Sequence, residues 1–295
     1  MKILRPFLYV LIVSGSISCE KAIDFDLEDQ EPKLVVEATI ENETWPIVFL
    51  SNSLNYFSTL DPYYIQQSFV HNAVIYVSNG TKTHVLKEYE VPLQGGYSLF
   101  YYTVDSSNLA TAFKGELNKQ YTMEIEVNSK EYTATTTIPA ITKRIDSMWA
   151  RTIPGFYDPN KRALMVKATD PAGYGDYIRY FTSSNSEPFF PGLISVFDDK
   201  IIDGTTYSVE IERGVDRNLP HEEGYSFFNK TDTVTLKLCN IDKATYDFWR
   251  TMEFSYGSIG NPFASPTKVL SNISNNALGY FGGYAPQFRT IIIPR

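Results

Sequence analysis

The sequence predicts an all-β protein made of two β-sandwich domains of the immunoglobulin or transthyretin type, the second with one short helix. Short segments of β-branched and aromatic residues recur along the chain, and Gly, Pro, Asn and Asp separate them. The chain is 43% hydrophobic and 15% aromatic, which is enough to fill sizeable cores. It shows no Gly-rich loop between a strand and a helix and no alternation of strands with helices. A nucleotide-binding α/β fold is therefore not expected, and no cofactor is predicted.

Residues 1–18 are predicted to form a lipoprotein signal peptide. Lys2 and Arg5 give it a positive start, and an apolar run over residues 7–13 is too short to span a bilayer. Small residues then lead to Cys19. This order resembles a lipobox, in which a signal peptidase cleaves before the cysteine and the thiol receives the lipid. A serine stands three positions before the cysteine, where leucine is usual. The alternative is plain secretion with an incidental cysteine.

Residues 19–32 are predicted to form an acidic tether between the lipid and the first domain, because they are short and irregular. Acidic residues soon after the lipidated cysteine resemble the signal that sends Bacteroidota lipoproteins to the outer face of the outer membrane. Glu20, Asp24 and Asp26 are the candidate residues for this signal. The alternative is a merely solvated linker. The expected location is the outer membrane, with the lipid-anchored protein facing the cell exterior.

Residues 33–140 are predicted to form the N-terminal β-sandwich. Asn79-Gly80 is a typical hairpin turn, and the segment 121–127 alternates between apolar and polar residues as a half-buried strand does. Strands are expected at residues 34–40, 45–50, 73–77, 83–86, 96–101, 121–127 and 131–138. Residues 51–69 lack any periodicity and are predicted to form a long loop.

The predicted loop carries two aromatic pairs that are candidates for contact with a partner or a ligand. They are Tyr56 with Phe57, and Tyr63 with Tyr64. Long loops inside compact domains are often functional or mobile. The alternative is that these side chains pack on their own domain.

Residues 141–295 are predicted to form a second β-rich domain, after a junction at residues 139–141. Strands are expected near residue 145 and at residues 164–169, 177–181, 194–197, 206–211, 233–238 and 278–281. Cys239 follows one of these alternating segments and is predicted to be a small core residue.

A helix is predicted near residues 242–254, with Asp242 as its N-cap. One side of this helix is apolar and is expected to pack on the second sheet, through Ile241, Thr245, Phe248, Trp249 and Met252. The segment Asn261-Pro262-Phe263 then breaks the helix. Phe263 is predicted to be a buried anchor whose truncation to Ala costs about 3–5 kcal/mol.

The residue types exclude some functions and leave others unsupported. The formal net charge is -8 and the chain has no basic stripe, so binding to nucleic acid is not predicted. The three histidines, His71, His84 and His221, lack partners at metal-ligand spacing, and no Gly-x-Ser-x-Gly elbow occurs. The segments 170–176 and 198–204 could each supply oxygen ligands to calcium, but turn chemistry explains both. The sequence therefore predicts neither a metal site nor an enzyme.

Several short motifs, spread along nearly the whole mature chain, resemble those of one family. They are Lys33–Ile40, Ala73-Val74, Gly260-Asn261-Pro262-Phe263, Pro266, Ser271-Asn272-Ile273 and Gly279-Tyr280-Phe281-Gly282. In this order they are similar to the Bacteroidota lipoproteins grouped as domain of unknown function 4249. The resemblance implies a lipid-anchored, β-rich envelope protein, often encoded beside TonB-dependent outer-membrane receptors. The family has no established chemistry, so the resemblance transfers no catalytic residue.

The sequence thus favours a non-enzymatic accessory or binding protein that acts with an outer-membrane β-barrel, a TonB-dependent receptor. The motivation is the lipid anchor, the β-rich domains and the high content of Tyr and Phe. Two alternatives stay open. One is a carboxylate-dependent envelope hydrolase, for example one that acts on glycans, because paired carboxylates meet in space and not in sequence. The other is a structural subunit of an envelope assembly machine.

Overall fold

A computed structural model describes residues 31–54, 61–217, 219–261, 263–265 and 267–295. Residues 32–295 form one compact unit. Strands hold 48% of the structure and helices 9%, which confirms the all-β prediction. None of the helices in the described ranges is long and apolar enough to cross a membrane.

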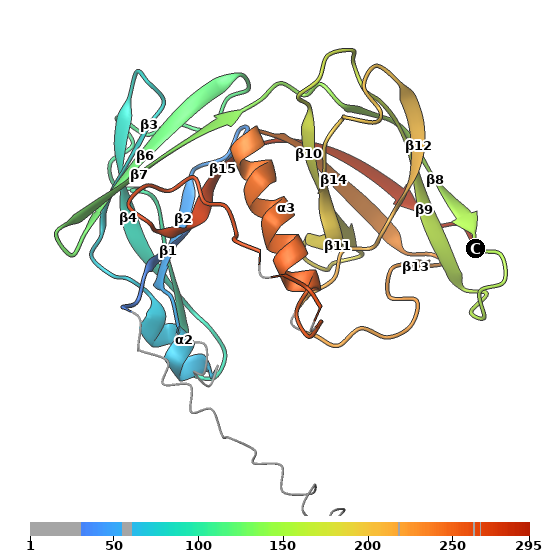
Figure 1. Cartoon of the computed structure of the whole chain (residues 1–295), viewed down its shortest axis with the longest axis horizontal. Helices are drawn as coiled ribbons and strands as arrows, with labels where there is room; N and C mark the ends of the chain where they lie inside the picture. The colour runs from blue at the N-terminus through green and yellow to red at the C-terminus, as the bar shows by residue number, and fades with distance from the viewer. Residues whose placement is uncertain (1–30, 55–60, 218, 262, 266) are drawn as a thin grey trace, which may run out of the picture. The chain divides into compact units, whose positions relative to one another are not determined.

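The strands and helices follow the chain as Figure 1 labels them. The strands of the first half are β1 (Leu34–Glu41), β2 (Ile47–Asn52), β3 (Val74–Ser78), β4 (Thr83–Pro92), β5 (Ser98–Val104), β6 (Lys119–Val127) and β7 (Lys130–Ile138). Those of the second half are β8 (Arg144–Thr152), β9 (Lys161–Thr169), β10 (Tyr177–Ser184), β11 (Phe190–Phe197), β12 (Thr206–Ile211), β13 (Phe228–Asn229), β14 (Thr233–Ile241) and β15 (Leu278–Ile292). The two helices are α2 (Pro62–Ser68) and α3 (Lys243–Gly257).

One sheet of eleven strands runs through both halves of the chain. Its order is β11-β10-β14-β15-β1-β2-β5-β4-β3-β6-β7. A second sheet has the order β12-β9-β13, and β8 also pairs with β9. Figure 1 shows α3 lying in the middle of the unit, beside β15 and β10.

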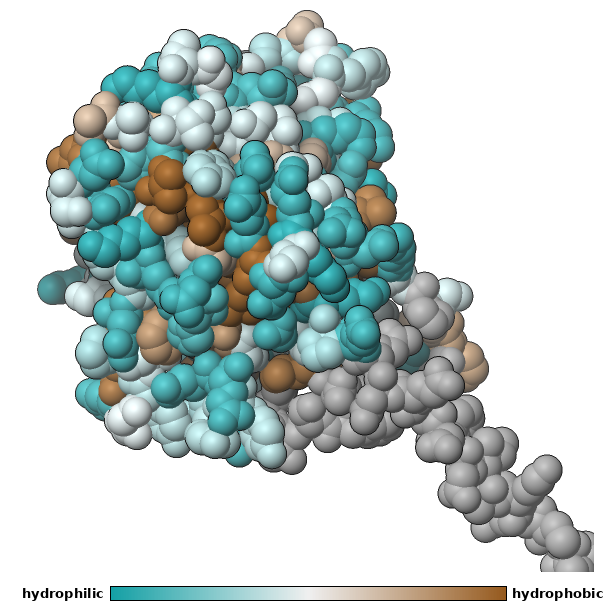
Figure 2. Space-filling model, turned by 90° about the vertical axis from the view of Figure 1, so that its left-hand side faces the viewer, coloured by the Kyte–Doolittle hydropathy of each residue, from teal (hydrophilic) through white to brown (hydrophobic). Residues whose placement is uncertain are grey.

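The N-terminal half is a sandwich with its own hydrophobic core. Alternate side chains of β1, such as Val36 and Ala38, are buried together with Ile75 of β3 and Ile125 of β6. The strands β1, β2 and β5 therefore pack against β3, β6 and β7. Opposite this core, the outer surface of the sandwich that Figure 2 shows is mostly hydrophilic, with hydrophobic side chains in a few places. The strands and the core of this half agree with the predicted all-β, sandwich-like fold.

The C-terminal half has two hydrophobic clusters, one on each side of β14. Leu236 and Leu238 point to one side, where they meet Leu164 and Val166 of β9 and form the second sandwich. Cys239 and Ile241 point to the other side, which α3 covers. Cys239 is fully buried as a free thiol, as predicted for a core residue, and burial raises its pKa to about 12.

The strand β15 belongs to both halves. It pairs with β1 in parallel through residues 278–284 and with β14 in antiparallel through residues 284–292. Phe281 and Ala285 enter the N-terminal core, whereas Ile291 and Ile293 pack on the second sandwich. The division of the chain near residue 140 stays a prediction, and β15 contributes side chains on both sides of it.

The strand predicted at residues 278–281 is longer than expected, because β15 extends to Ile292. Glycines and a proline interrupt the β-branched pattern in this segment, and such residues usually argue against a long strand. In β15, the neighbouring strands explain these residues. Gly279 has a φ of +94°, and a Cβ at this position would lie 1.8 Å from the carbonyl oxygen of Val36. Pro286 lies beyond the last residue that pairs with β1, so its missing N–H breaks no hydrogen bond on that side.

The prediction of a loop over residues 51–69 is wrong for residues 51–52, which belong to β2, and for residues 62–68, which form α2. The side chain of Asp61 caps the helix by accepting a hydrogen bond from the backbone N–H of Tyr64 at 2.9 Å, and Pro62 follows the cap. No residue of α2 is buried. The helix therefore lacks the apolar periodicity by which a sequence reveals a helix.

The prediction of a helix near residues 242–254 is confirmed, and α3 ends three residues later than expected. Asp242 accepts from the backbone N–H of Thr245 at 2.9 Å, as an N-cap does, and from the backbone N–H of Thr137 on β7 at 2.9 Å. The predicted apolar side is also mostly correct, because Thr245 and Phe248 are buried, but Met252 is exposed.

The prediction that Phe263 is a buried anchor is wrong. Its side chain is 94% exposed. The backbone N–H of Phe263 donates to the side chain of Asn261 at 3.0 Å, so this segment is a local Asx turn. The turn does not need the phenylalanine ring, and the ring carries no packing in the core.

Candidate functional site

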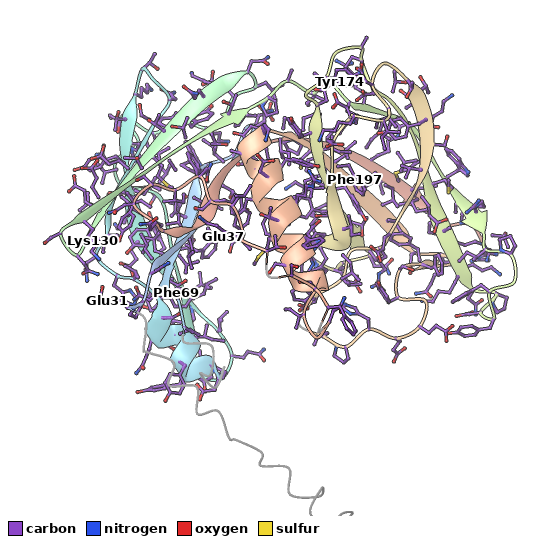
Figure 3. All side chains as sticks on the ribbon, viewed as in Figure 1. Glu31, Glu37, Phe69, Lys130, Tyr174 and Phe197 are labelled. Carbon is purple, nitrogen blue, oxygen red and sulfur yellow. The ribbon has the colours of Figure 1, made fainter. Side chains whose placement is uncertain are left out.

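One face of the eleven-stranded sheet lies opposite the two sandwich cores, and its N-terminal part is open to solvent in the described part of the chain. Along β1, Val36 and Ala38 point into the core, whereas Val35 and Glu37 point to this second face. Figure 3 shows Glu37 between the N-terminal strands and α3. This open surface is the strongest candidate for a functional site.

A row of aromatic side chains crosses the open surface. Tyr89 on β4 faces Tyr101 on β5, and their ring centroids are 6.0 Å apart in a stacked arrangement. Phe49 on β2 lies 6.0 Å from Tyr101 on the other side. These three residues form the aromatic face. The row continues with Glu37, which faces Phe49, and ends at Tyr280 on β15.

Aliphatic side chains extend the aromatic face along its strands. Ile47 lies two residues before Phe49 on β2, and Val91 faces Leu99 across β4 and β5. Ile47 and Val91 are both exposed. A contiguous apolar surface on a folded protein is typical of a binding site and less typical of a surface that contacts only water.

A hollow of about 420 Å³ lies at one end of the aromatic face. It is lined by Val35, Glu37, Phe49, Ser51, Phe69 and Leu99. Glu37 is accessible to solvent, but the surrounding protein displaces much of its water, and this raises the pKa of its carboxyl despite the opposing charge of Arg179. The hollow thus combines apolar walls with one acidic group.

A second hollow of about 420 Å³ lies beside α2, and Tyr63, His71, Tyr97 and Phe100 help to line it. His71 packs edge-on against Phe100, with ring centroids 4.5 Å apart, and forms an ion pair with Glu88. The predicted contact residues Tyr63 and Tyr64 are exposed on α2, and Tyr63 lines this hollow. Their rings lie 6.0 Å apart.

The same face of the sheet is covered in the C-terminal half. Phe248 and Trp249 of α3 pack on Tyr280 of β15, with ring centroids 4.4 Å and 5.2 Å from the tyrosine ring. The guanidinium of Arg179 lies 3.3 Å from the centroid of the Trp249 ring and donates to the hydroxyl of Tyr284 at 3.2 Å. These aromatic groups are core residues, and their side chains are not available to a partner.

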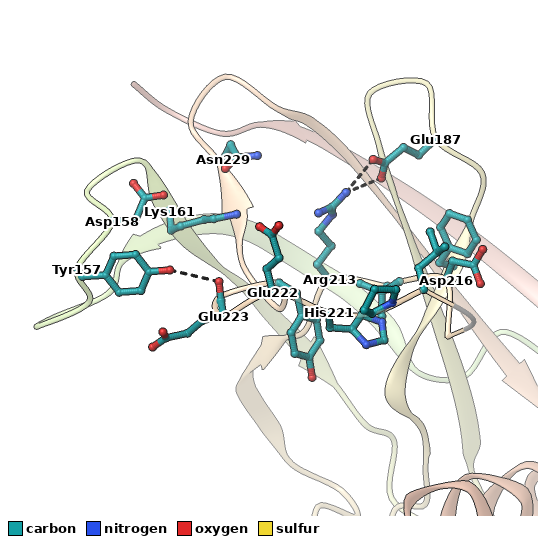
Figure 4. Close-up of a pocket in the computed structure, with 16 residues that line it drawn as sticks. Tyr157, Asp158, Lys161, Glu187, Arg213, Asp216, His221, Glu222, Glu223 and Asn229 are labelled. Carbon is teal, nitrogen blue, oxygen red and sulfur yellow. Dashed lines mark hydrogen bonds and ion pairs between the residues drawn. The ribbon is translucent and has the colours of Figure 1, made fainter.

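A further hollow of about 550 Å³ lies among the loops of the C-terminal half, as Figure 4 shows. Arg213 binds Glu187 there through two contacts of 2.8 Å, and the ring of His221 packs on Tyr225 at 4.8 Å. The lining includes groups of both charges, such as Lys161 and Glu222. An internal ion pair and mixed charge fit a solvated loop surface better than a site for one charged ligand.

Two acidic segments that the sequence treats separately meet at the end of the C-terminal strands. Asp170 follows β9, Asp176 precedes β10 and Asp199 follows β11. One oxygen from each carboxyl lies within 4.8 Å of the other two. Lys143 lies beside this acidic cluster, with its Nζ 2.9 Å from Oδ1 of Asp170. Sequence reasoning missed this group because the three residues belong to different strand ends.

Other predicted site residues lie outside the described ranges. They are Cys19, Glu20, Asp24, Asp26, Tyr56 and Phe57. The aromatic face itself was not predicted, although a local signal exists. Tyr89 and Tyr101 stand at the alternate positions of their strands where a half-buried strand usually has polar residues.

The comparisons with known proteins place the chain in a family and assign it no activity. No curated protein matches the chain. One family model, described as "Domain of unknown function (DUF4249)", matches residues 20–289, which is nearly the whole chain after the predicted leader. The chain therefore belongs to the family Domain of unknown function (DUF4249).

Proposed function

We propose that the protein is a lipid-anchored accessory protein of the outer membrane that binds a β-barrel partner, a TonB-dependent receptor, through its aromatic face. The lipid is carried by Cys19, and the residues Glu20, Asp24 and Asp26 direct the protein to the cell exterior. The leader-like start of the sequence supports the anchor. The resemblance to Bacteroidota lipoproteins, which are often encoded beside such receptors, supports the partner.

The observation that carries this proposal is the open row of Tyr89, Tyr101 and Phe49. Tyr and Phe are enriched at the centres of protein interfaces, where a few buried aromatic side chains supply most of the binding free energy. Lys87 on β4 and Glu37 on β1 are exposed at the borders of this row. An aromatic centre with charged residues around it has the composition of a protein-binding surface.

The alternative of a carboxylate-dependent hydrolase gains no specific support. Such an enzyme needs two carboxyl groups that face each other across a substrate cleft. Asp170, Asp176 and Asp199, whose carboxyl oxygens lie within 4.8 Å of one another, cluster beside Lys143, and Asp170 and Asp199 are buried.

Affinity purification tests the proposal. The tagged wild-type protein, a Phe49→Ala/Tyr101→Ala variant and a Tyr174→Ala control are purified from detergent-solubilised outer membranes, and the bound proteins are identified by mass spectrometry. Tyr174 is an exposed tyrosine on a loop of the C-terminal half, so it matches the change without touching the aromatic face. We expect a β-barrel receptor with the wild type and the control, and at least tenfold less with the double variant. Equal recovery with all three proteins, or no barrel with any of them, contradicts the proposal.

Protease treatment of intact cells tests the location separately. We expect digestion of the wild-type protein and protection of a variant whose Glu20, Asp24 and Asp26 are replaced by Asn or Gln. A Cys19→Ser variant is expected in the soluble fraction. Protection of the wild-type protein would place it on the inner side of the membrane.

A further inference from the structure

We propose that Asp170, Asp176 and Asp199 bind one divalent cation, with Ca²⁺ as the preferred ion. The site lies where the chain leaves β9, enters β10 and leaves β11. It goes beyond the partner binding proposed above and does not depend on it.

The spacing of the carboxylates fits a single ion. One oxygen from each of the three residues lies within 4.8 Å of the other two. Oxygen ligands sit about 2.3–2.6 Å from Ca²⁺, so two oxygens on the same ion are at most about 5 Å apart. The three oxygens can therefore contact one ion with little movement of their side chains.

A buried carboxyl oxygen without a partner points independently to a ligand. Asp170 is only 2% exposed; its Oδ1 is ion-paired with the ammonium of Lys143 at 2.9 Å, whereas its Oδ2 accepts no hydrogen bond from the described residues. Leaving a buried carboxylate oxygen without a partner is costly, and nearly all buried polar groups in native proteins have partners. A cation bound to Oδ2 of Asp170 would supply the missing partner.

The charge of the acidic cluster indicates a divalent ion. The side chains of Lys143 and Asp170 are fully buried, and the ammonium of Lys143 is the positive group beside the cluster. By formal charge, three carboxyl groups and one ammonium sum to −2. One divalent cation would balance this formal charge, and one monovalent cation would not.

The cluster is also held in place and open to solvent on one side. The Oδ2 of Asp199 accepts from the backbone N–H groups of Gly175 at 2.8 Å and Asp176 at 3.0 Å. The hydroxyl of Thr142 donates to Oδ1 of Asp176 at 2.7 Å. Asp199 also lines a surface hollow together with Tyr174, Gly175, Tyr177, Asp198 and Lys200. Water from this hollow can complete the coordination shell.

The chemistry of the ligands favours Ca²⁺ over Mg²⁺. Both are hard ions that prefer oxygen, but Mg²⁺ requires near-octahedral geometry and keeps most of its water. Ca²⁺ accepts irregular shells of 6–8 ligands, which suits a cluster of carboxylates from three strand ends. The bound ion would join the loops at this end of the second sandwich and stabilise it.

Calorimetric titration and thermal unfolding of the EDTA-treated mature protein test the proposal. We expect one Ca²⁺ per chain and a rise in Tm of roughly 5 °C in millimolar CaCl₂, with a smaller rise in MgCl₂. An Asp199→Asn variant is expected to lose both effects. A Glu126→Gln variant removes one exposed acid from β6 and should keep both.

Further results decide the proposal if Asp199→Asn fails to fold. A Lys143→Met variant, which removes the competing ammonium, is expected to bind Ca²⁺ at least tenfold more tightly than the wild type. The absence of heat and of any Tm change for the wild type in millimolar CaCl₂ overturns the proposal. Unchanged binding in a folded Asp199→Asn variant overturns the location, and a response to Mg²⁺ alone overturns the choice of ion.

Discussion

The two ends of one row of side chains have opposite environments. Tyr280, at the β15 end, is 3% exposed because Phe248 and Trp249 of α3 pack on it. Tyr101 occupies the same row and the same face of the sheet at the β5 end, where no element in the described ranges stacks on it as α3 does on Tyr280. The row therefore presents aromatic rings on β4, β5, β2 and β15, and α3 covers only the β15 end.

The difference in exposure between Tyr280 and Tyr101 suggests different roles, in stability for the covered ring and in the proposed partner binding for the open ring. A ring that is covered by a helix stabilises the fold through burial, and burial also raises the pKa of Tyr280 well above its ordinary value. A ring on the open side contributes less to folding, because much of its surface stays in water. The aromatic side chains on the open side are therefore the ones that support the proposed binding role.

The largest expected effect is at the covered end. Phe248→Ala removes a buried ring that stacks on Tyr280, and we expect a loss of about 3–5 kcal/mol in the free energy of unfolding, measured by urea denaturation. Phe254→Ala on the same helix is the matched control, because Phe254 is 60% exposed, and a loss below about 0.5 kcal/mol is expected there. Equal effects in the two variants would remove the distinction between covered and open rings.

The open end should show the reverse pattern. Tyr101→Ala is expected to lower the free energy of unfolding by about 1 kcal/mol and to weaken partner binding at least tenfold. The two quantities are measured on the same preparation, by urea denaturation and by titration with the purified barrel. A loss of stability as large as that of Phe248→Ala, with binding unchanged, would make Tyr101 a core residue.

Glu37 lies between the two ends and should respond to pH. The folded protein raises the pKa of its carboxyl above 4.5, so ionisation costs stability in the folded state. This contribution favours folding below pH 4.5 and is lost as the pH rises through the raised pKa. We therefore expect Glu37→Gln to equal the wild type at pH 4 and to exceed its stability at pH 7.5 by less than about 1 kcal/mol, because the group is accessible to solvent. A variant that is less stable than the wild type at pH 7.5 would contradict this sign.

The smallest effect is expected at Phe263. Its ring is 94% exposed, so Phe263→Ala should change the free energy of unfolding by no more than about 0.5 kcal/mol in chemical denaturation. This replaces the loss of 3–5 kcal/mol that the sequence suggested. A loss near 3 kcal/mol would show that the ring is buried in solution.

Most strands were predictable because the order of apolar and polar residues within each strand is enough to identify it. The alternation in β6, for example, reflects one buried and one wet face, and the structure places that strand within two residues of the prediction. The helix α3 was predictable for the same reason, since its cap and its apolar side are both local. In contrast, α2 buries nothing, and the glycines of β15 have roles that only the neighbouring strand reveals.

The candidate sites were less predictable because they depend on register. Tyr89, Tyr101 and Phe49 come from three strands, and no sequence motif within one strand predicts that they lie side by side. The same holds for Asp176 and Asp199, which lie 23 positions apart in sequence and become neighbours through the pairing of β10 with β11. Phe263 shows the opposite case, since a conspicuous local motif proved to be a surface turn.

Site-specific photo-crosslinking in living cells tests the binding role of the aromatic face most directly. A photoreactive phenylalanine analogue replaces Tyr101 in one strain and Tyr174 in another, and the crosslinked proteins are identified after irradiation. The prediction is that a β-barrel receptor is crosslinked from position 101 and not from position 174. Crosslinking to the barrel from position 174 alone, or from neither position, would contradict the role assigned to the aromatic face.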